Sequence, residues 1–177
     1  MGYAVVGYFD EVSDRIIKSL WHGMADSDIC DYLISSDNNP HIKFAMYNEL
    51  EIEIIKDSLM LLTKQINKIP LHFKTFSFYP NDKPFICIDV AVSIPILTLH
   101  EKVQTAFEKY ALSDNNVYFR QGIWKPDCQL TLPLDKLKLV NAINYLSEMK
   151  LPFNGILEQI GLIEFHPAKQ LFSYELL

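Results

Sequence analysis

The order of strand-like and helix-like segments limits most strongly how this chain can fold. Residues 41–47 and 128–132 are short segments with apolar residues at alternate positions, which is typical of half-buried β-strands. Each is followed by a segment with apolar residues at helical spacing, and then by two β-rich runs. One architectural unit therefore occurs twice, at about 40–92 and 128–176, although the two stretches differ in their letters.

Turn formers and capping residues place the individual elements. The turn-rich segment 80–84 separates two β-rich runs, which we expect to pair as a hairpin. Asn48 with Glu51, and Thr98 with Glu101, have the spacing of capping boxes at helix starts. The predicted strands are 3–9, 41–47, 71–79, 85–92, 128–132, 156–165 and 171–176, and the predicted helices are 12–24, 48–66, 98–110 and 135–149.

The repeated unit predicts an α+β fold. A strand, a helix and a hairpin that occur twice suggest a duplicated, bilobal unit in which two antiparallel sheets face a central cleft and helices cover the outside. Residues 1–177 would then form a single bilobal domain, and equivalent strands would bring His41 and Gln129 to related positions across the cleft. Since 49% of the residues are apolar and 21% are charged, the chain is hydrophobic enough to bury a core.

Composition argues against several classes of function. The 16 Lys and Arg against 22 Asp and Glu give a net charge of -6, which disfavours binding of long duplex nucleic acid through a basic face. The three cysteines are far apart, which suggests a reducing cytoplasm, and the sequence has no Cys pair at metal-ligand spacing. No apolar run approaches the roughly 20 residues of a membrane helix. We therefore expect a cytoplasmic monomer without a metal, a cofactor or contact with a membrane.

Two tetrapeptides, one in each repeated unit, contain the residues of greatest chemical interest. Residues 41–44 read His-Ile-Lys-Phe, and residues 129–132 read Gln-Leu-Thr-Leu. They resemble the paired motifs of the 2H phosphoesterase superfamily, which includes 2′-5′ RNA ligases and cyclic phosphodiesterases. Family members carry the pattern His, hydrophobic, Ser or Thr, hydrophobic in each lobe, on a strand that lines the cleft. The resemblance covers nearly the whole chain and implies the same bilobal fold.

The resemblance implies a role for four residues. His41 matches the first catalytic histidine and Thr131 matches the second hydroxyl, whereas Gln129 replaces the second histidine and Lys43 replaces the first hydroxyl. In the family, one imidazole takes a proton from the attacking water and the other gives a proton to the leaving sugar oxygen. Because glutamine cannot exchange a proton near neutral pH, His41 is the candidate for acid-base catalysis. The other three residues are candidates for contacts with the phosphate oxygens.

Three functions remain open at this point. The first is a phosphoesterase that acts on a small nucleotide or an RNA end, such as a 2′,3′-cyclic phosphate, with weak or altered activity. The second is a non-catalytic nucleotide-binding or RNA-binding domain that has lost the second catalytic histidine. The third is a structural or partner-binding protein in which side chains fill the cleft.

Residues outside the tetrapeptides are further candidates for the border of the cleft. Arg120 and Trp124 lie in the connector before the second tetrapeptide, where a loop can supply phosphate contacts or a ring for base stacking. Aromatic rings at such places often serve only to pin a loop to the body of the protein. His72, in the strand 71–79, is the histidine that we consider as a substitute for the missing second imidazole.

Overall fold

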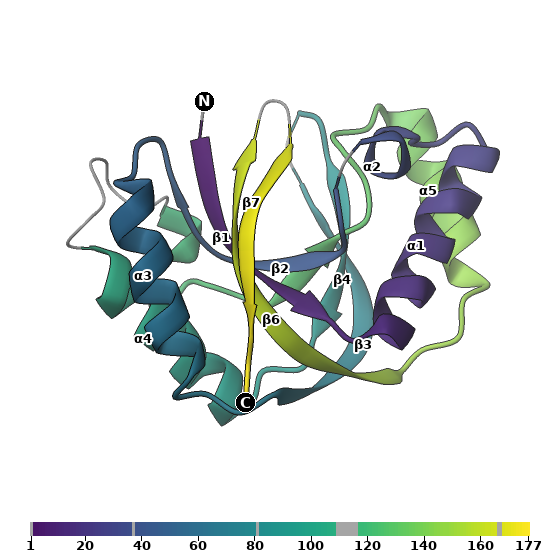
Figure 1. Cartoon of the computed structure of the whole chain (residues 1–177). Coiled ribbons are helices and arrows are strands. Elements are labelled where there is room, and N and C mark those ends of the chain that lie inside the picture. The colour runs from purple at the N-terminus through teal and green to yellow at the C-terminus, as the bar shows by residue number, and fades with distance from the viewer. Residues whose placement is uncertain (1, 37, 81, 109–116, 166–167) are drawn as a thin grey trace.

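The chain folds into an antiparallel sheet with helices on two sides (Figure 1). A computed structural model describes residues 2–36, 38–80, 82–108, 117–165 and 168–177. The strands are β1 (Gly2–Phe9), β2 (His41–Tyr47), β3 (Ile69–Tyr79), β4 (Phe85–Val90), β5 (Asp127–Gln129), β6 (Phe153–Phe165) and β7 (Lys169–Glu175). The helices are α1 (Glu11–Asp26), α2 (Tyr32–Ser35), α3 (Ile52–Thr63), α4 (Ile94–Phe107), α5 (Lys136–Ser147) and the short 3-10 helix η2 (Val117–Phe119). Of these described helices, none is long and apolar enough to cross a lipid bilayer.

Hydrogen bonds join the described strands into one sheet in the order β1-β2-β5-β4-β3-β6-β7. β1 also pairs with β6, so the strands from β1 to β6 close on themselves, and β7 extends the sheet beyond β6. In Figure 1, α3 and α4 lie on one side of the strands, and α1, α2 and α5 lie on the other. The predicted α+β class, with antiparallel strands and outer helices, is confirmed. The hydrogen bonds also connect the two predicted sheets to each other.

The first strand and helix follow the predicted pattern because both depend on local signals. β1 is buried along almost its whole length, as expected for the apolar run 3–9. Asp10 caps α1, and its side chain accepts hydrogen bonds from the backbone N–H groups of Val12 and Ser13. These bonds satisfy donors that the first turn of a helix leaves without a partner in the helix itself.

Both predicted capping boxes are wrong. α3 begins at Ile52 after Glu51, whose side chain makes no capping hydrogen bond. α4 begins at Ile94, one turn before the predicted start, because Pro95 suits the first helical turn, where its missing N–H has no helical partner to lose. His100 therefore lies inside α4, where it is buried.

The end of α3 is also shifted, and tertiary hydrogen bonds are the reason. The helix ends at Thr63 rather than near Ile66. The backbone N–H of Lys68 donates to the carbonyl of Leu177 (2.8 Å), and the N–H of Leu177 donates to the carbonyl of Ile66 (2.9 Å). These groups pair with the end of the chain instead of continuing the helix. The predicted end of the next helix, at residue 110, lies outside the described residues.

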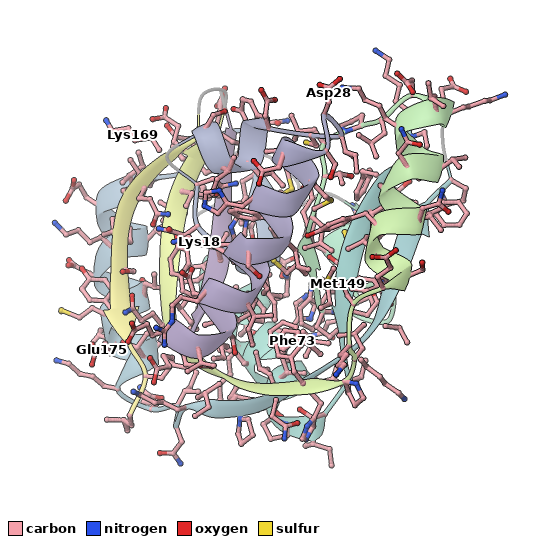
Figure 2. All side chains as sticks on the ribbon, turned by 90° about the vertical axis from the view of Figure 1, so that its right-hand side faces the viewer. Lys18, Asp28, Phe73, Met149, Lys169 and Glu175 are labelled. Atoms are coloured by element: carbon pink, nitrogen blue, oxygen red, sulfur yellow. The ribbon has the colours of Figure 1, made fainter. Side chains whose placement is uncertain are left out.

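Aromatic rings pack together in the core. Phe73 of β3 has no exposed surface. Its ring stacks on Phe153 with 4.4 Å between the centroids, and the ring of Phe9 meets it edge-on at 5.1 Å. Figure 2, which looks onto α1 and α5, labels Phe73 within the densely packed side chains. This packing holds β3, β6 and the end of β1 together.

Candidate functional site

A cavity of about 320 Å³ lies beside three neighbouring strands, β2, β5 and β4, and the connector 117–126. Its wall combines charged side chains with aromatic rings, so it can accommodate both an ionic group and a planar one. The lining residues are His41, Lys43, Met46, Tyr79, Phe85, Cys87, Tyr118, Phe119, Ile123, Trp124, Lys125, Asp127 and Gln129.

The register of β2 and β5 brings the two tetrapeptides together. Ile42 pairs with Cys128 in an antiparallel ladder. Because side chains alternate along a strand, the residues on either side of this pair share the opposite face of the sheet. His41 and Lys43 therefore lie next to Gln129, and all three line the cavity. The tetrapeptides occupy neighbouring strands of the closed sheet and reach the same cavity.

His41 is a neutral, buried imidazole with one nitrogen free to accept. It is 6% exposed, and Nδ1 lies 2.7 Å from the carbonyl oxygen of Asn39, so Nδ1 carries the hydrogen and donates it. Nε2 is buried and has no hydrogen-bond partner among the described residues. Burial, reinforced by the positive charge of Lys43 and opposed by the bond to Asn39, lowers the pKa of His41 to about 3. The imidazole therefore presents an unprotonated acceptor at neutral pH.

Lys43 and Gln129 form a hydrogen-bonded pair beside His41. The Lys43 Nζ donates to the Gln129 Oε1 at 2.8 Å, and the Gln129 Nε2 donates to the carbonyl of Thr131 at 2.8 Å. Both ends of the amide are thus used, which holds Gln129 in one orientation. Burial lowers the pKa of Lys43, and the hydrogen bond found for its ammonium within the described residues goes to a neutral amide.

Thr131 is fully buried and does not line the cavity. Its hydroxyl accepts a hydrogen bond from the backbone N–H of Ile86 at 2.9 Å. The backbone N–H groups of Leu130 and Thr131 both approach the carbonyl of Ile86, at 2.8 and 3.3 Å, as in a β-bulge. This irregularity ends β5 at Gln129 instead of residue 132, and it turns Thr131 away from the cavity face.

The three residues considered for the border of the cleft have different positions. Trp124 lines the cavity, and its indole N–H donates to the carbonyl of Lys43 at 2.8 Å while its ring stacks on His100 at 4.1 Å. Arg120 is exposed and is not among the lining residues. His72 is exposed, and its Nδ1 lies 2.7 Å from the Asn154 Oδ1. Since His72 is not among the lining residues either, it does not supply a second imidazole to the cavity.

The sequence patterns did not indicate two residues of the cavity wall, the phenol of Tyr79 and the carboxylate of Asp127. The Tyr79 hydroxyl donates to the Asp127 Oδ2 at 2.5 Å. The Lys125 Nζ lies 2.7 Å from the Asp89 Oδ1 and 3.5 Å from the Asp127 Oδ2. Asp127 stands two positions before Gln129, so alternation along β5 was the available signal, but the predicted strand began one residue too late. Among the described residues, no group of three or more His, Cys, Asp or Glu side chains is arranged to hold a metal ion.

The lowered pKa of His41 should make the fold less stable in acid. The unfolded chain takes up this proton near the ordinary pKa of 6.5, whereas the folded protein resists it down to about 3. Because the unfolded state binds more protons in this window, the free energy of unfolding falls as the pH decreases from 6.5 towards 3. Urea unfolding at about pH 7 and about pH 4.5 should show a smaller loss for His41→Gln than for the wild type. Equal losses would contradict a buried neutral imidazole.

Comparisons by sequence find no relative, since no protein-family model and no curated protein matches the chain. Comparison with solved structures does find similar proteins. TT0787 of Thermus thermophilus matches with a TM-score of 0.63 and 13% identity, over 99% of this chain and 98% of that chain. LigT of E. coli in complex with 3′-AMP matches with a TM-score of 0.63 and 12% identity, over 98% and 97%. Usb1 of Kluyveromyces marxianus matches with a TM-score of 0.51 and 9% identity, over 96% of each chain.

The structural similarity extends over nearly the full length of each chain, so it concerns the whole fold. At identities of 9% to 13%, it concerns the arrangement of the backbone and not the chemistry of individual residues. The backbone arrangement and the paired tetrapeptides nevertheless point the same way. The chain therefore has the fold of the 2H phosphoesterases, the superfamily that its tetrapeptides resemble.

Proposed function

We propose that the protein binds a nucleotide or the end of an RNA through a phosphoester, and that it hydrolyses a 2′,3′-cyclic phosphate slowly. The observation that carries this proposal is that two groups of strand β2 reach the same cavity. They are the ammonium of Lys43 and the unpartnered Nε2 of His41. A buried ammonium bonded to a neutral amide favours an anionic ligand, because the ligand then compensates the charge.

The cavity offers the groups that a nucleotide phosphoester needs. After its bond to Gln129, the Lys43 ammonium keeps donors for the phosphate oxygens. His41 Nε2 can accept a proton from a water molecule while that water forms a bond to phosphorus. Tyr118, an exposed residue of the cavity wall, supplies an aromatic ring for a base. E. coli LigT, which shares the fold, has been solved with 3′-AMP, ATP, NADP+ and phosphate, which supports a nucleotide as the ligand class.

The second proton transfer explains why we expect slow turnover. When the cyclic ester opens, the leaving sugar oxygen must receive a proton, and Gln129 has none to give near neutral pH. Solvent water would then supply this proton less efficiently than an imidazole would. His41 is also a weak base, since its pKa is lowered to about 3.

A second candidate function is binding without turnover. The observation that favours it is the amide of Gln129, which occupies the place of the second imidazole and bonds at both ends to the protein. Such a site would recognise the phosphoester and release it unchanged.

Chromatography of reaction products distinguishes the two functions. The purified protein is incubated with nucleoside 2′,3′-cyclic phosphates and with a 2′-5′ dinucleotide. Turnover that disappears in a His41→Ala variant would support the phosphoesterase. Binding of the same ligands without turnover would support the binding domain, and absence of both would contradict the proposal.

Removing the Lys43 charge should weaken phosphate binding. Lys43→Met keeps an unbranched side chain one atom shorter but deletes a charge-assisted hydrogen bond, so we expect the Kd for 3′-AMP to rise by about tenfold to a hundredfold. Isothermal titration calorimetry measures this change. Lys136→Met, at the exposed start of α5, removes the same charge away from the cavity and should leave the Kd unchanged. An unchanged Kd in Lys43→Met would show that the anion does not bind at this ammonium.

A further inference from the structure

The charges around the cavity are nearly balanced before any ligand enters. Among the described residues that line it, the lysine, arginine, aspartate and glutamate side chains are those of Lys43, Lys125 and Asp127. The Lys125 ammonium is already engaged, because it donates to the Asp89 Oδ1 at 2.7 Å and to the Ser77 Oγ at 2.9 Å, and it also lies 3.5 Å from the Asp127 Oδ2. Among the described residues, Lys43 forms no ion pair within 4.0 Å, so its ammonium is the lining cation that can turn to the anion of a ligand.

Asp127 stands close to that positive charge. Since Ile42 pairs with Cys128, the antiparallel register places Asp127 of β5 beside Lys43 of β2, on the cavity side. The Tyr79 hydroxyl donates to Oδ2, while Oδ1 has no hydrogen-bond partner within the described part of the chain. The side chain of Asp127 is only 19% exposed, so solvent screens its charge weakly.

This arrangement should favour ligands with one negative charge over ligands with two. A phosphodiester or a cyclic phosphate carries a single negative charge, which the Lys43 ammonium balances. A phosphomonoester carries a second negative charge above its second pKa of about 6, and that charge would face the Asp127 carboxylate at short range. Repulsion between like charges in a poorly solvated cavity is much stronger than in water.

We propose that Asp127 is a specificity-determining residue that admits phosphodiester monoanions to the cavity and disfavours phosphomonoester dianions. This inference rests on the proposed function and goes beyond it by naming the charge state of the ligand. It also predicts weak inhibition by the product, because opening a cyclic phosphate yields a monoester. The carboxylate would thus help the product to leave.

Several neighbouring groups control the charge of Asp127. They are Lys43 of β2, Tyr79 of β3, Cys87 and Asp89 of β4, Cys128 of β5 and Lys125 of the connector. Burial raises the pKa of Asp127, the bond from Tyr79 and the charge of Lys125 oppose this rise, and the charge of Asp89 adds to it. The carboxylate therefore takes up a proton at a higher pH than an ordinary aspartate. The preference for the phosphodiester over the phosphomonoester should therefore weaken as the pH falls.

A pair of ligands that differ by one methyl group, and therefore by one negative charge at about pH 8, tests the inference. The ligands are 2′-deoxyadenosine 3′-phosphate and its methyl diester, which lack the 2′-hydroxyl and cannot cyclise. At about pH 8, calorimetry with the wild type should give a Kd for the diester about tenfold lower than for the monoester, as one additional like-charge contact predicts. Asp127→Asn keeps an oxygen that accepts from Tyr79 but removes the charge, so the monoester should gain about tenfold in affinity.

Controls separate this inference from the proposed function. Asp57→Asn removes one negative charge from the exposed face of α3 and should leave the ratio of the two Kd values unchanged. If both ligands bind and Asp127→Asn leaves the ratio as it is in the wild type, the inference is overturned while the proposed function stands. If neither ligand binds to the wild type at about pH 8 or about pH 6, the proposed function fails and the inference falls with it.

Discussion

Alanine in place of His41 is expected to lower the rate of 2′,3′-cyclic phosphate hydrolysis by about 10²-fold, the lower end of the range for acid-base groups. Among the described residues that line the cavity, His41 is the histidine, and its Nε2, which has no hydrogen-bond partner, can act as a general base. The expected loss is at the lower end because an imidazole with a pKa of about 3 is a weak base. Initial rates followed by chromatography measure the effect.

A binding measurement shows whether His41→Ala loses only the catalytic group or the whole ligand site. The Kd for 3′-AMP should change little in His41→Ala, because the imidazole is neutral and the anion is held by Lys43. His72→Ala removes an exposed histidine outside the cavity and should leave the rate unchanged. Equal rates for His41→Ala and the wild type would rule out His41 as the acid-base group.

Histidine in place of Gln129 is expected to raise the rate of the same reaction by about 10²-fold, since it would supply a proton donor for the leaving oxygen. The residue lies beside His41 on the neighbouring strand and lines the same cavity. The substitution restores the second histidine of the family pattern at the position where this chain departs from it. The same chromatographic assay measures the gain.

Lys43 complicates this gain, because its ammonium contacts residue 129 and would lower the pKa of an imidazole there. The double variant Lys43→Thr with Gln129→His removes that charge and restores the first hydroxyl of the family pattern. We expect this double variant to be protonated at residue 129 up to a higher pH than the single variant, and its rate to persist to a higher pH. Gln65→His, on the exposed surface, serves as the matched control. A rate no higher than that of the wild type in both variants would contradict the assigned role of this position.

Elements with strong local signals could be predicted from the sequence. β2 has the predicted bounds, His41–Tyr47, because alternating apolar residues follow a cluster of turn formers. The hairpin of β3 and β4 pairs Tyr79 with Phe85 across the predicted turn. Asp135 caps α5, and its side chain accepts from the backbone N–H of Lys138. Each of these features depends on residues only a few positions apart.

The helix starts at Asn48 and Thr98 were predicted wrongly for a physical reason. Several polar residues near a helix start can act as caps, and the spacing of a capping box does not show which of them does. In α4, Pro95 allows the helix to begin a turn earlier, and Ser93 becomes the residue before it. Boundaries of this kind depend on how the whole helix packs.

The sequence by itself determined the repeated order of elements and the two tetrapeptides. Three residues of these tetrapeptides, His41, Lys43 and Gln129, line one cavity. Tertiary structure decided the rest of the site. Period-two alternation would put Thr131 on the same face as Gln129, but both backbone donors of the bulge turn to the carbonyl of Ile86, and Thr131 is buried. The carbonyl belongs to β4, far earlier in the chain, so no local pattern encodes it.

The charge states of the site were likewise decided by the fold. The lowered pKa of His41 comes from burial and from the charge of Lys43, and the raised pKa of Asp127 comes first from burial. Burial is produced by elements that are distant in sequence, such as β4 and the connector before β5. A linear pattern shows which titratable groups a chain has, whereas their surroundings decide which protons they hold, because the cost of a charge depends on the solvent and charges around it.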